Sequence, residues 1–343
     1  MLIHEKLLGG GLLSEEEFKE LILNREKYSE LFKAEAKKLT EKIFGNKIYI
    51  RGLIEITNFC KNDCYYCGIR KSNSNVERYA LSDEEILLCC EEGYKAGFKT
   101  FVLQGGELKK DYVPLVKSIR EKYPECAITL SLGELSYDEY KALKDAGADR
   151  YLLRHETADC EHYKKLHPES MKLENRLKCL SDLKSLGIQT GCGFMVGSPY
   201  QTAETLAKDL KFIQDFKPHM VGIGPFIPQS DTPFKDEKAG SVELTLYLLS
   251  VLRLMLPNLL LPATTALGSI KEGGREEGIL HGANVVMPNI SPMSAREKYQ
   301  LYNNKLKTGA ETKEGLLLLE KSLNRIERTI AFERGDYKEK DCD

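Results

Sequence analysis

The spacing of apolar residues along the chain changes near residue 47. Beyond this point, short runs rich in β-branched and aromatic residues alternate with longer stretches that have the periodicity of an amphipathic helix. This alternation is typical of strand–helix units that build a parallel sheet. The eight runs cover residues 49–56, 100–103, 127–130, 150–153, 189–195, 220–223, 259–261 and 284–287. Eight units favour an α/β fold with a closed (β/α)8 TIM-type barrel, and an incomplete barrel or a doubly wound sheet are the alternatives.

Before residue 47 the apolar spacing is helical, so we predict an N-terminal helical extension over residues 1–46 that forms a cap or plug ahead of the barrel. The barrel itself is expected to span residues 47–302. Residues 303–343 are expected to add a helix over 312–330 and a charged tail over 333–343 that stays solvated. Three helix starts have the spacing of a capping box, a serine followed three residues later by a glutamate. The pairs are Ser14 with Glu17, Ser82 with Glu85, and Ser136 with Glu139.

Composition adds limits on location and partners. Among 343 residues, 50 basic and 52 acidic side chains give a formal net charge of −2, which does not indicate a nucleic-acid or anionic-membrane surface. No apolar run approaches the roughly 20 residues that a membrane helix needs, and residues 1–13 lack the pattern of a signal peptide. Ten cysteines are too sparse for a disulfide scaffold. We therefore expect a cytoplasmic protein with metal or redox chemistry.

The most distinctive residues follow the first predicted strand. Cys60, Cys64 and Cys67 form a C-x3-C-x2-C sequence, and one loop with this spacing brings three thiolates to three corners of a cubane iron–sulfur cluster. Structural zinc usually takes four protein ligands, and the next histidine is as far along as His155. A disulfide would leave one thiol over. The spacing therefore favours a [4Fe–4S] cluster with three cysteine ligands and one open iron.

An open iron can bind the amino and carboxylate groups of S-adenosylmethionine (SAM), and one electron then breaks a carbon–sulfur bond. The resulting radical needs a site that excludes water. A barrel places its chemistry in the loops after its strands, and the loop after the second predicted strand reads Gln-Gly-Gly-Glu over 104–107. Its glycines would let backbone approach a ligand and Glu107 would bind an ammonium group, although an ordinary turn is the alternative. Tyr66 is expected to pack on adenine or simply against its neighbours.

Together these residues resemble the radical SAM superfamily, in particular its biotin synthase-like branch, in which the cysteine motif with Tyr66 is followed here by Gly-Ile-Arg70. A narrower resemblance, to the radical SAM maturases of FeFe-hydrogenase, covers residues 45–302. It rests on VLQGGE over 102–107, LSLGE over 130–134, RYLLRHETA over 150–158, MVGIGPFIP over 220–228, PATTA over 262–266 and ANVVMPN over 283–289.

The resemblance implies one [4Fe–4S] cluster and SAM as cofactors, and a role in assembling the dinuclear iron subcluster of the hydrogenase. The implied substrate is a small organometallic species with iron-bound cysteine, carbonyl and cyanide, whose sulfur the adenosyl radical attacks. The implied partners are a reduced ferredoxin-like electron donor and other hydrogenase maturases, with neither nucleic acid nor membrane.

The resemblance also implies two sets of site residues. Those implied to contact SAM are Tyr66, Gln104, Gly105, Gly106, Glu107, Arg154, Glu156 and Arg176. Those implied to line the substrate cavity are Thr129, Ser131, Thr264, Thr265, Met287, Tyr299 and Tyr302. For Thr129 and Met287 the alternative is barrel filling, and for Arg154 with Glu156 it is a plain ion pair.

The sequence departs from the family at one point. Many members carry three further cysteines near the C-terminus that hold a second cluster, whereas residues 306–319 have none here and Cys342 stands alone. We therefore expect no second cluster. The remaining cysteines are expected to be packed apolar residues, and His162 and His167 to be surface or packing residues.

Three rival functions remain open. Methylornithine synthase, an amino-acid mutase, and biotin synthase, a sulfur-inserting enzyme, belong to the same branch and share the cleavage step. The loops over 262–266 and 224–228 favour the maturase. A protein of another class, an iron–sulfur precursor scaffold or carrier, would not form 5'-deoxyadenosine.

Overall fold

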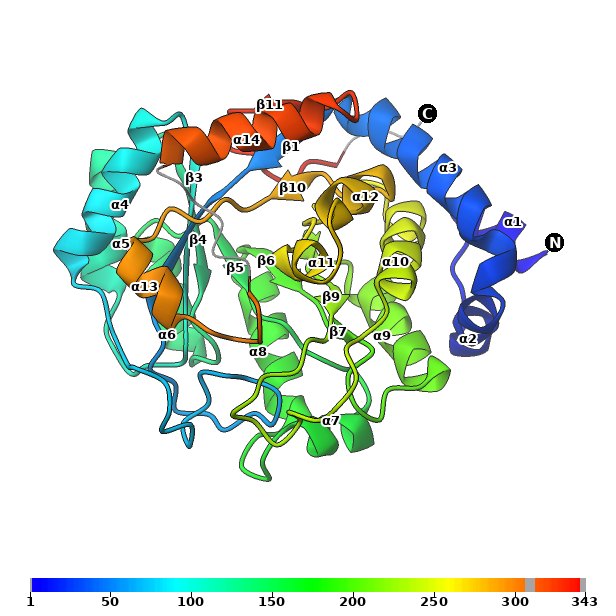
Figure 1. Cartoon of the computed structure of the whole chain (residues 1–343), viewed down its shortest axis with the longest axis horizontal. Coiled ribbons are helices and arrows are strands. Elements are labelled where there is room, and N and C mark those ends of the chain that lie inside the picture. The colour runs from blue at the N-terminus through cyan, green and yellow to red at the C-terminus, as the bar shows by residue number, and fades with distance from the viewer. Residues whose placement is uncertain (1, 306–311, 340–343) are drawn as a thin grey trace.

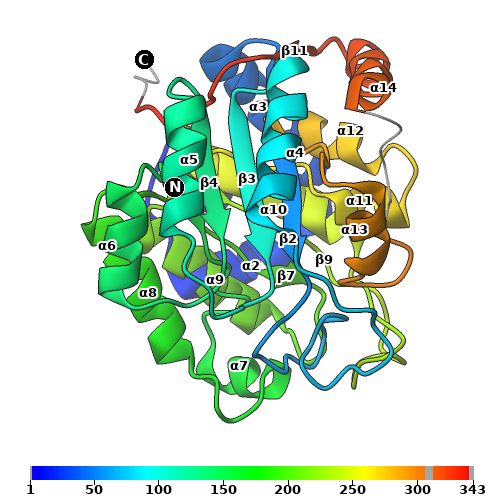
Figure 2. The ribbon, with the colours of Figure 1, turned by 90° about the vertical axis from the view of Figure 1, so that its left-hand side faces the viewer.

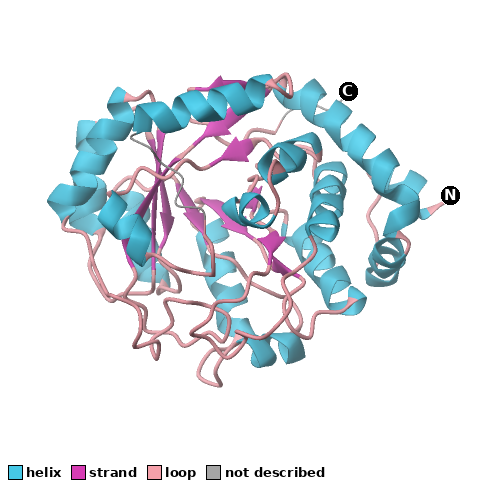
Figure 3. Cartoon of the chain, viewed as in Figure 1, coloured by secondary structure: helices cyan, strands magenta, loops and turns pink. Residues whose placement is uncertain are grey.

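Six parallel strands form most of the wall of a barrel (Figures 1 and 3). The computed structural model describes residues 2–305 and 312–339, so Cys342 and residues 306–311 lie outside the described residues. In spatial order the strands are β2 (Gly52–Thr57), β3 (Thr100–Gly105), β4 (Ala127–Ser131), β5 (Arg150–Leu152), β6 (Gln189–Cys192) and β8 (Met220–Val221). All pair in parallel, as strand–helix repeats require.

Two further segments close the wall. Met220 forms a parallel bridge with Leu260, and Pro262 forms one with Val285 of β10 (Val285–Val286). A last parallel bridge joins Leu53 to Asn289 and completes the ring. Within the described residues the wall therefore has eight segments, and the predicted (β/α)8 barrel is confirmed.

Some predicted strands differ from the prediction. The run over 49–56 is divided at Arg51 into β1 (Lys47–Ile50) and β2, which belong to different sheets. The run over 259–261 forms only isolated bridges. The run over 189–195 is interrupted at Gly193, whose φ is 153°, and a Cβ there would lie 2.0 Å from the carbonyl oxygen of Gly222. Beyond this break, β7 (Met195–Val196) pairs with β9 (Gly224–Pro225) as a separate two-stranded ribbon.

Helices lie outside the barrel wall (Figure 3). The helices that follow β2 are α4 (Asp83–Lys95), α5 (Val113–Lys122), α6 (Tyr137–Asp145), α7 (Cys160–Leu166), α8 (Leu173–Ser185), α9 (Ala203–Phe216), α10 (Val242–Met255), α11 (Thr265–Ile270), α12 (Gly274–Leu280), α13 (Met293–Lys298) and α14 (Thr312–Asn324). All three predicted capping boxes are confirmed, because each serine hydroxyl accepts a hydrogen bond from the amide of the glutamate three residues on. No helix in the described ranges is long and apolar enough to cross a membrane.

The N-terminal helices form a lateral layer instead of a plug. They are α1 (Ile3–Leu8), α2 (Glu15–Leu23) and α3 (Arg25–Phe44). In Figure 1 they lie beside α9 and α10, with α2 packed on α9 and α3 on α10. Tyr247 of α10 donates its hydroxyl to the carbonyl of Leu21, and Gln214 of α9 bonds both backbone groups of Leu13.

One end of the barrel is covered by the C-terminal segment, and not by the N-terminal helices as a plug would require. The predicted helix over 312–330 is wrong beyond Asn324, because β11 (Thr329–Ala331) pairs with β1 (Lys47–Ile50). Figure 2 shows β11 at one end of the barrel, opposite the end where α7 lies. β-Branched Thr329 and Ile330 suit this sheet position better than a helix.

Residues 334–337 close the end at which the strands begin. Arg150, the first residue of β5, is buried and lies 2.5 Å from Asp336. Arg334 reaches Asp336 at 2.7 Å and Asp149 at 2.8 Å, and its carbonyl accepts from Thr100, the first residue of β3. The expectation of a solvated tail is therefore wrong for these residues.

Candidate active site

The cysteine loop begins directly after β2, at the end of the barrel where the strands finish. Cys60, Cys64 and Cys67 are partly buried, and all nine cysteines in the described ranges are free thiols. Arg78, which the sequence did not indicate, ties the loop together. Its guanidinium donates to the carbonyls of Asn58 at 2.5 Å, Ile69 at 2.8 Å, Arg70 at 2.6 Å and Asn73 at 3.0 Å.

The three thiols suit a cluster better than a single ion. Among the described residues, no three Cys, His, Asp or Glu side chains are placed to hold one metal ion together. A cubane binds each thiolate through a different iron, so its ligands need to be neighbours without converging on one point. The charges of the three thiols affect one another, so the thiols lie near one another. Burial raises the pKa of Cys67 to about 12, with a contribution from Cys60, and burial together with Cys67 and Cys60 raises that of Cys64. Iron bound by these sulfurs would have to displace their protons.

The loop after β3 packs against the cysteine loop. A Cβ at Gly106 would lie 2.3 Å from the carbonyl oxygen of Phe59 and 2.8 Å from Cβ of Cys60. The amide of Glu107 lies 3.4 Å from Sγ of Cys60, and its carbonyl accepts from the amide of Lys61 at 2.9 Å. Glycine is thus required at position 106 because the loop after β3 packs closely on the cysteine loop. The sequence had suggested only that this glycine lets a ligand approach the backbone.

Arg176, on α8, joins the loops that follow three strands. Its Nε donates to Oε1 of Glu134 at 2.5 Å, and its Nη1 donates to the carbonyl of Arg154 at 3.0 Å. Its Nη2 lies 3.8 Å from Oε1 of Glu107. Gly133 makes room for this arrangement, since a Cβ there would lie 1.9 Å from Cγ of Glu107. Of the residues implied to contact SAM, Glu107, Arg154 and Arg176 are therefore brought together.

Several buried polar atoms of this group lack hydrogen bonds. Oε2 of Glu107, Oε2 of Glu156, and Nε and Nη2 of Arg154 are buried without a hydrogen bond. Lys61 and Arg154 approach the two carboxylates at 3.2 Å, close enough for ion pairs but not aligned for hydrogen bonds. Each buried polar atom left without a hydrogen bond costs about 1–3 kcal/mol. A zwitterionic ligand with hydroxyl groups would supply such partners, so these residues fit SAM.

The hydroxyl of Tyr66 forms a hydrogen bond with His167, which the sequence predicted to be a surface or packing residue. Nδ1 of His167 lies 3.0 Å from the carbonyl oxygen of Tyr163, so Nδ1 must carry the proton. Nε2 therefore accepts from the Tyr66 hydroxyl at 3.1 Å. His167 is buried, and burial lowers its pKa to about 3. A surface position for His167 is wrong, and nothing in its spacing indicated this contact. His162 is buried as well.

The residues implied to line the substrate cavity are spread along the barrel. Near the closed end, Thr129 borders a small cavity with Arg51 and Arg150, and its hydroxyl has no hydrogen bond. Near the open end, the amide of Gln104 lies 3.4 Å from the hydroxyl of Tyr299. The others lie at or beside element ends: Ser131 ends β4, Thr264 precedes Thr265 at the start of α11, Met287 follows β10, and Tyr302 follows α13.

A buried ion pair lies beside Tyr299, and the sequence did not predict it. Lys305 pairs with Glu55 of β2, and its Nζ also donates to the carbonyl of Tyr299 at 3.0 Å. Glu55 is fully buried, and its backbone amide donates to Oγ of Ser291 at 2.7 Å. The chain after α13 is thereby anchored to the barrel wall.

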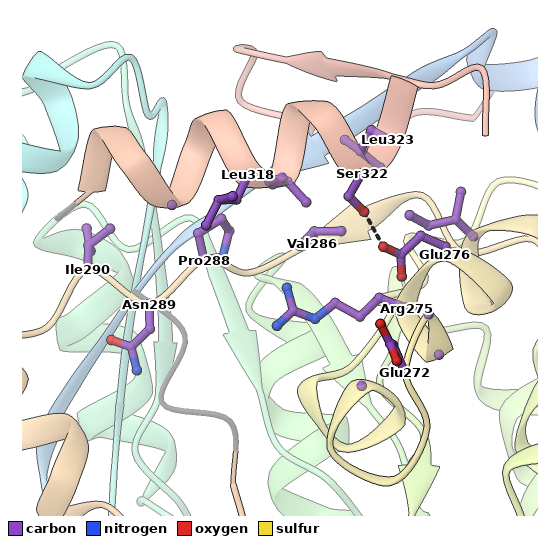
Figure 4. A pocket seen from close by; sticks show the side chains of 16 residues that line it. Glu272, Arg275, Glu276, Val286, Pro288, Asn289, Ile290, Leu318, Ser322 and Leu323 are labelled. Carbon is purple, nitrogen blue, oxygen red and sulfur yellow. Dashed lines mark hydrogen bonds between the residues drawn. The ribbon is translucent and has the colours of Figure 1, made fainter. Parts of the chain in front are cut away.

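A second cavity, of about 390 Å³, lies between α14 and the α11–α12 region. Figure 4 shows Arg275 and Asn289 below α14, with Leu318 and Leu323 on the helix side. Ser322 of α14 donates its hydroxyl to Glu276 of α12. Val286, Pro288 and Asn289 of the motif over 283–289 border this cavity, but none of the residues implied to contact SAM or the substrate does.

Comparison with known proteins agrees with this geometry. Residues 54–213 match the Radical SAM superfamily. The [FeFe] hydrogenase maturase subunit HydE of Thermotoga maritima is 45% identical over 291 residues, which are 83% of this chain and 82% of that protein. The 3-methylornithine synthase of Methanosarcina acetivorans is 29% identical over 86% of this chain and 85% of that protein. The crystal structure of methylornithine synthase superposes with a TM-score of 0.82 at 26% identity, covering 96% of this chain and 97% of that one.

A barrel with this cysteine loop and this family match defines a radical SAM enzyme, whose cofactors are a [4Fe–4S] cluster and SAM. Within that superfamily, the chain belongs to the HydE family of [FeFe]-hydrogenase maturases.

Proposed function

We propose that this enzyme cleaves SAM reductively and acts on an iron-bound cysteine during assembly of the dinuclear iron subcluster of FeFe-hydrogenase. The main support is the set of carboxylate and guanidinium atoms of Glu107, Glu156 and Arg154 that are buried without hydrogen bonds. The proposal is further supported by 45% identity to a protein named as a hydrogenase maturase subunit.

Each side of the site has its own task in this proposal. Cys60, Cys64 and Cys67 hold the cluster, and the open iron takes SAM. Glu107, Arg154, Glu156 and Arg176 orient SAM through its ammonium, carboxylate and hydroxyl groups, with Gln104, Gly105 and Gly106 beside its methionine end and Tyr66 near its adenine. When bound, SAM and the cluster supply the 5'-deoxyadenosyl radical.

The barrel interior holds the substrate in this proposal. Thr129, Ser131, Thr264, Thr265, Met287, Tyr299 and Tyr302 line the cavity for the organometallic iron–cysteine species. The hydroxyl of Thr264, like that of Thr129, is buried without a hydrogen bond, so both are available to a small ligand. Buried Tyr299 and the Glu55–Lys305 pair beside it exclude water from this side. A reduced ferredoxin-like donor and other hydrogenase maturases are the proposed partners.

The cleavage step is tested by anaerobic reconstitution with iron and sulfide, followed by SAM and dithionite. Wild-type protein should bind a cluster and form 5'-deoxyadenosine, whereas Cys64→Ala should lose cluster iron and form no product. Cys89→Ala is the matched control, because Cys89 is a free buried thiol on α4. Equal iron and product in C64A and wild type would overturn the ligand assignment.

The maturation role is tested in a host that makes FeFe-hydrogenase but lacks its own HydE. Expression of this chain should restore hydrogenase activity, and the C64A variant should not. Activity that stays absent, together with release of a rearranged amino acid by the purified enzyme, would instead support a mutase such as methylornithine synthase.

A further inference from the structure

Glu156 has a backbone conformation that is unusual for its residue type. Its φ is 65°, in the left-handed region, where an L side chain is disfavoured. Glu156 is buried, and its charge adds to the effect of burial in raising the pKa values of Tyr66 and Cys67. A strained residue whose carboxylate faces the cysteine loop requires neighbours that hold it there.

One set of neighbours comes from α9. Asp209 of this helix is fully buried, and its Oδ1 accepts from the amide of Ala158 at 2.5 Å. The same oxygen lies 3.3 Å from Nε2 of His155, which is also fully buried. The amide of Gly193 donates to Nδ1 of His155 at 3.3 Å, so the imidazole proton lies on Nε2 and faces Asp209. One carboxylate therefore contacts the chain on both sides of Glu156.

Other contacts complete the support. The amide of Glu156 itself donates to the carbonyl of Gly193 at 3.0 Å. Nε2 of His162 lies 2.9 Å from the carbonyl oxygen of Pro199, so its Nδ1 accepts from the hydroxyl of Thr157 at 3.1 Å. Residues 155–158 are thus held by contacts with two helices and with the chain after β6. Oε2 of Glu156 has no hydrogen bond of its own.

We propose that Asp209 is a positioning residue, which holds residues 155–158 so that the left-handed Glu156 presents its carboxylate to SAM. The inference rests on the proposed function in one respect, the contact of Glu156 with SAM. Within the described residues, Asp209 forms no ion pair with a lysine or arginine. Its Oδ1 contacts His155 and the amide of Ala158, and its Oδ2 has no hydrogen bond. A buried carboxylate is a costly way to stabilise a fold, and an apolar residue often serves as well. The carboxylate of Asp209 contacts residues on both sides of Glu156, so its role is to position Glu156 and not to stabilise the fold.

The test compares Asp209→Ala and Asp209→Asn with a control on the same helix. Gln214→Ala is that control, because Gln214 is a buried polar residue of α9 whose bonds go to Leu13, away from Glu156. Two quantities are measured on reconstituted protein: amide hydrogen exchange of residues 155–158 and the dissociation constant of SAM. D209A should speed exchange of the Glu156 and Ala158 amides and weaken SAM binding by about tenfold or more.

The conservative variant and the control separate positioning from stability. D209N keeps an oxygen for the Ala158 amide, so it should recover most of the SAM affinity. Q214A should lower the melting temperature but leave exchange at 155–158 and SAM binding unchanged. Unchanged exchange in D209A, or an equal loss of SAM affinity in Q214A, would overturn the proposal.

Glu156 variants distinguish the two levels of inference. E156Q should weaken SAM binding without changing exchange. E156G permits the positive φ without strain, so adding D209A to E156G should change SAM binding much less than D209A does in wild type. If E156Q binds SAM as wild type does, the SAM contact fails, while faster exchange in D209A would still show that Asp209 holds the segment. If D209A weakens SAM binding equally in wild type and in E156G, Asp209 does not act through Glu156.

Discussion

Nε of Arg176 lies 2.5 Å from Oε1 of Glu134, and this contact joins helix α8 to the loop after β4. The same guanidinium also bonds the carbonyl of Arg154 and approaches Glu107. One planar side chain therefore holds the loops after three neighbouring strands in a common arrangement around the cysteine loop.

Replacing Arg176 by Lys should disturb this arrangement although the charge is kept. An ammonium group cannot reproduce three directed contacts from one plane, so R176K should lower the free energy of unfolding by about 1–3 kcal/mol and weaken SAM binding. Denaturant unfolding and SAM titration measure the two effects. Lys178→Ala on the same helix removes only an exposed ion pair with Asp182 and should change stability by less than about 0.5 kcal/mol. An R176K protein as stable as K178A would contradict this role.

Gly106→Ala should damage the cluster site. The added Cβ would meet Phe59 and Cys60, and such overpacking costs about 1–3 kcal/mol and should move the first thiol. We expect G106A to bind less iron after reconstitution than wild type, measured by metal analysis. Gly222→Ala is the matched control, because no heavy atom lies within 4 Å of the Cβ position at this glycine, which follows β8. Full iron content in G106A would show that the cysteine loop adjusts without loss.

Asp336→Asn should weaken the closed end of the barrel. Arg150 is buried there, and loss of its charged partner should cost about 3 kcal/mol. Burial opposes the charged form, but Arg334 and Arg150 still lower the pKa of Asp336 to about 2. A lowered carboxyl pKa stabilises the folded state above the ordinary value of 3.8 and loses its effect as the pH falls toward 2.

The stability difference between wild type and D336N should therefore be constant above about pH 5 and shrink between about pH 4 and 2. Denaturant unfolding of cluster-free protein measures it, since acid would release the cluster. Asp145→Asn, at an exposed pair with Lys141, should change little at any pH. A D336N protein indistinguishable from D145N would mean that residues 334–337 contribute nothing to stability.

His167 should make the protein less stable in weak acid. Its pKa is about 3 when folded, against 6.5 when unfolded, because burial penalises the charged ring. Below 6.5 the unfolded chain takes up a proton that the folded chain does not, so stability falls with falling pH. At about pH 5.5 this amounts to about 1.4 kcal/mol relative to about pH 8. A His167→Gln variant should lack this part of the pH dependence, as measured by unfolding of cluster-free protein at both pH values.

The local parts of the fold were predictable because their causes are local. Helix starts at Ser14, Ser82 and Ser136 depend on residues three positions apart, and each was predicted from that spacing. The position of the cysteine loop after the first strand follows from the barrel rule in the same way. The break at Gly193 depends instead on Gly222, which lies between β8 and β9, and no pattern within the run over 189–195 indicated it.

Contacts between distant segments set the limit for the site as well. Thr329 and Ile330 form a strand only because β1 offers an edge about 280 residues earlier in the chain, so their helical spacing was misleading. The sequence does not distinguish Asp209 from other polar residues of a helix, because its contact with His155 forms only when α9 packs on the loop that carries His155. Arg78 and His167 likewise gain their roles from neighbours that the linear order does not bring together.

The glycines of the barrel loops have a consequence for protein design. A side chain at Gly106 would clash with Phe59 and Cys60, and one at Gly133 would clash with Glu107. The conformation of each loop therefore depends on the loop beside it. Transplanting the cysteine segment alone onto another barrel would separate it from the surfaces that shape it. A graft intended to carry this chemistry would have to move the three adjoining loops as one unit.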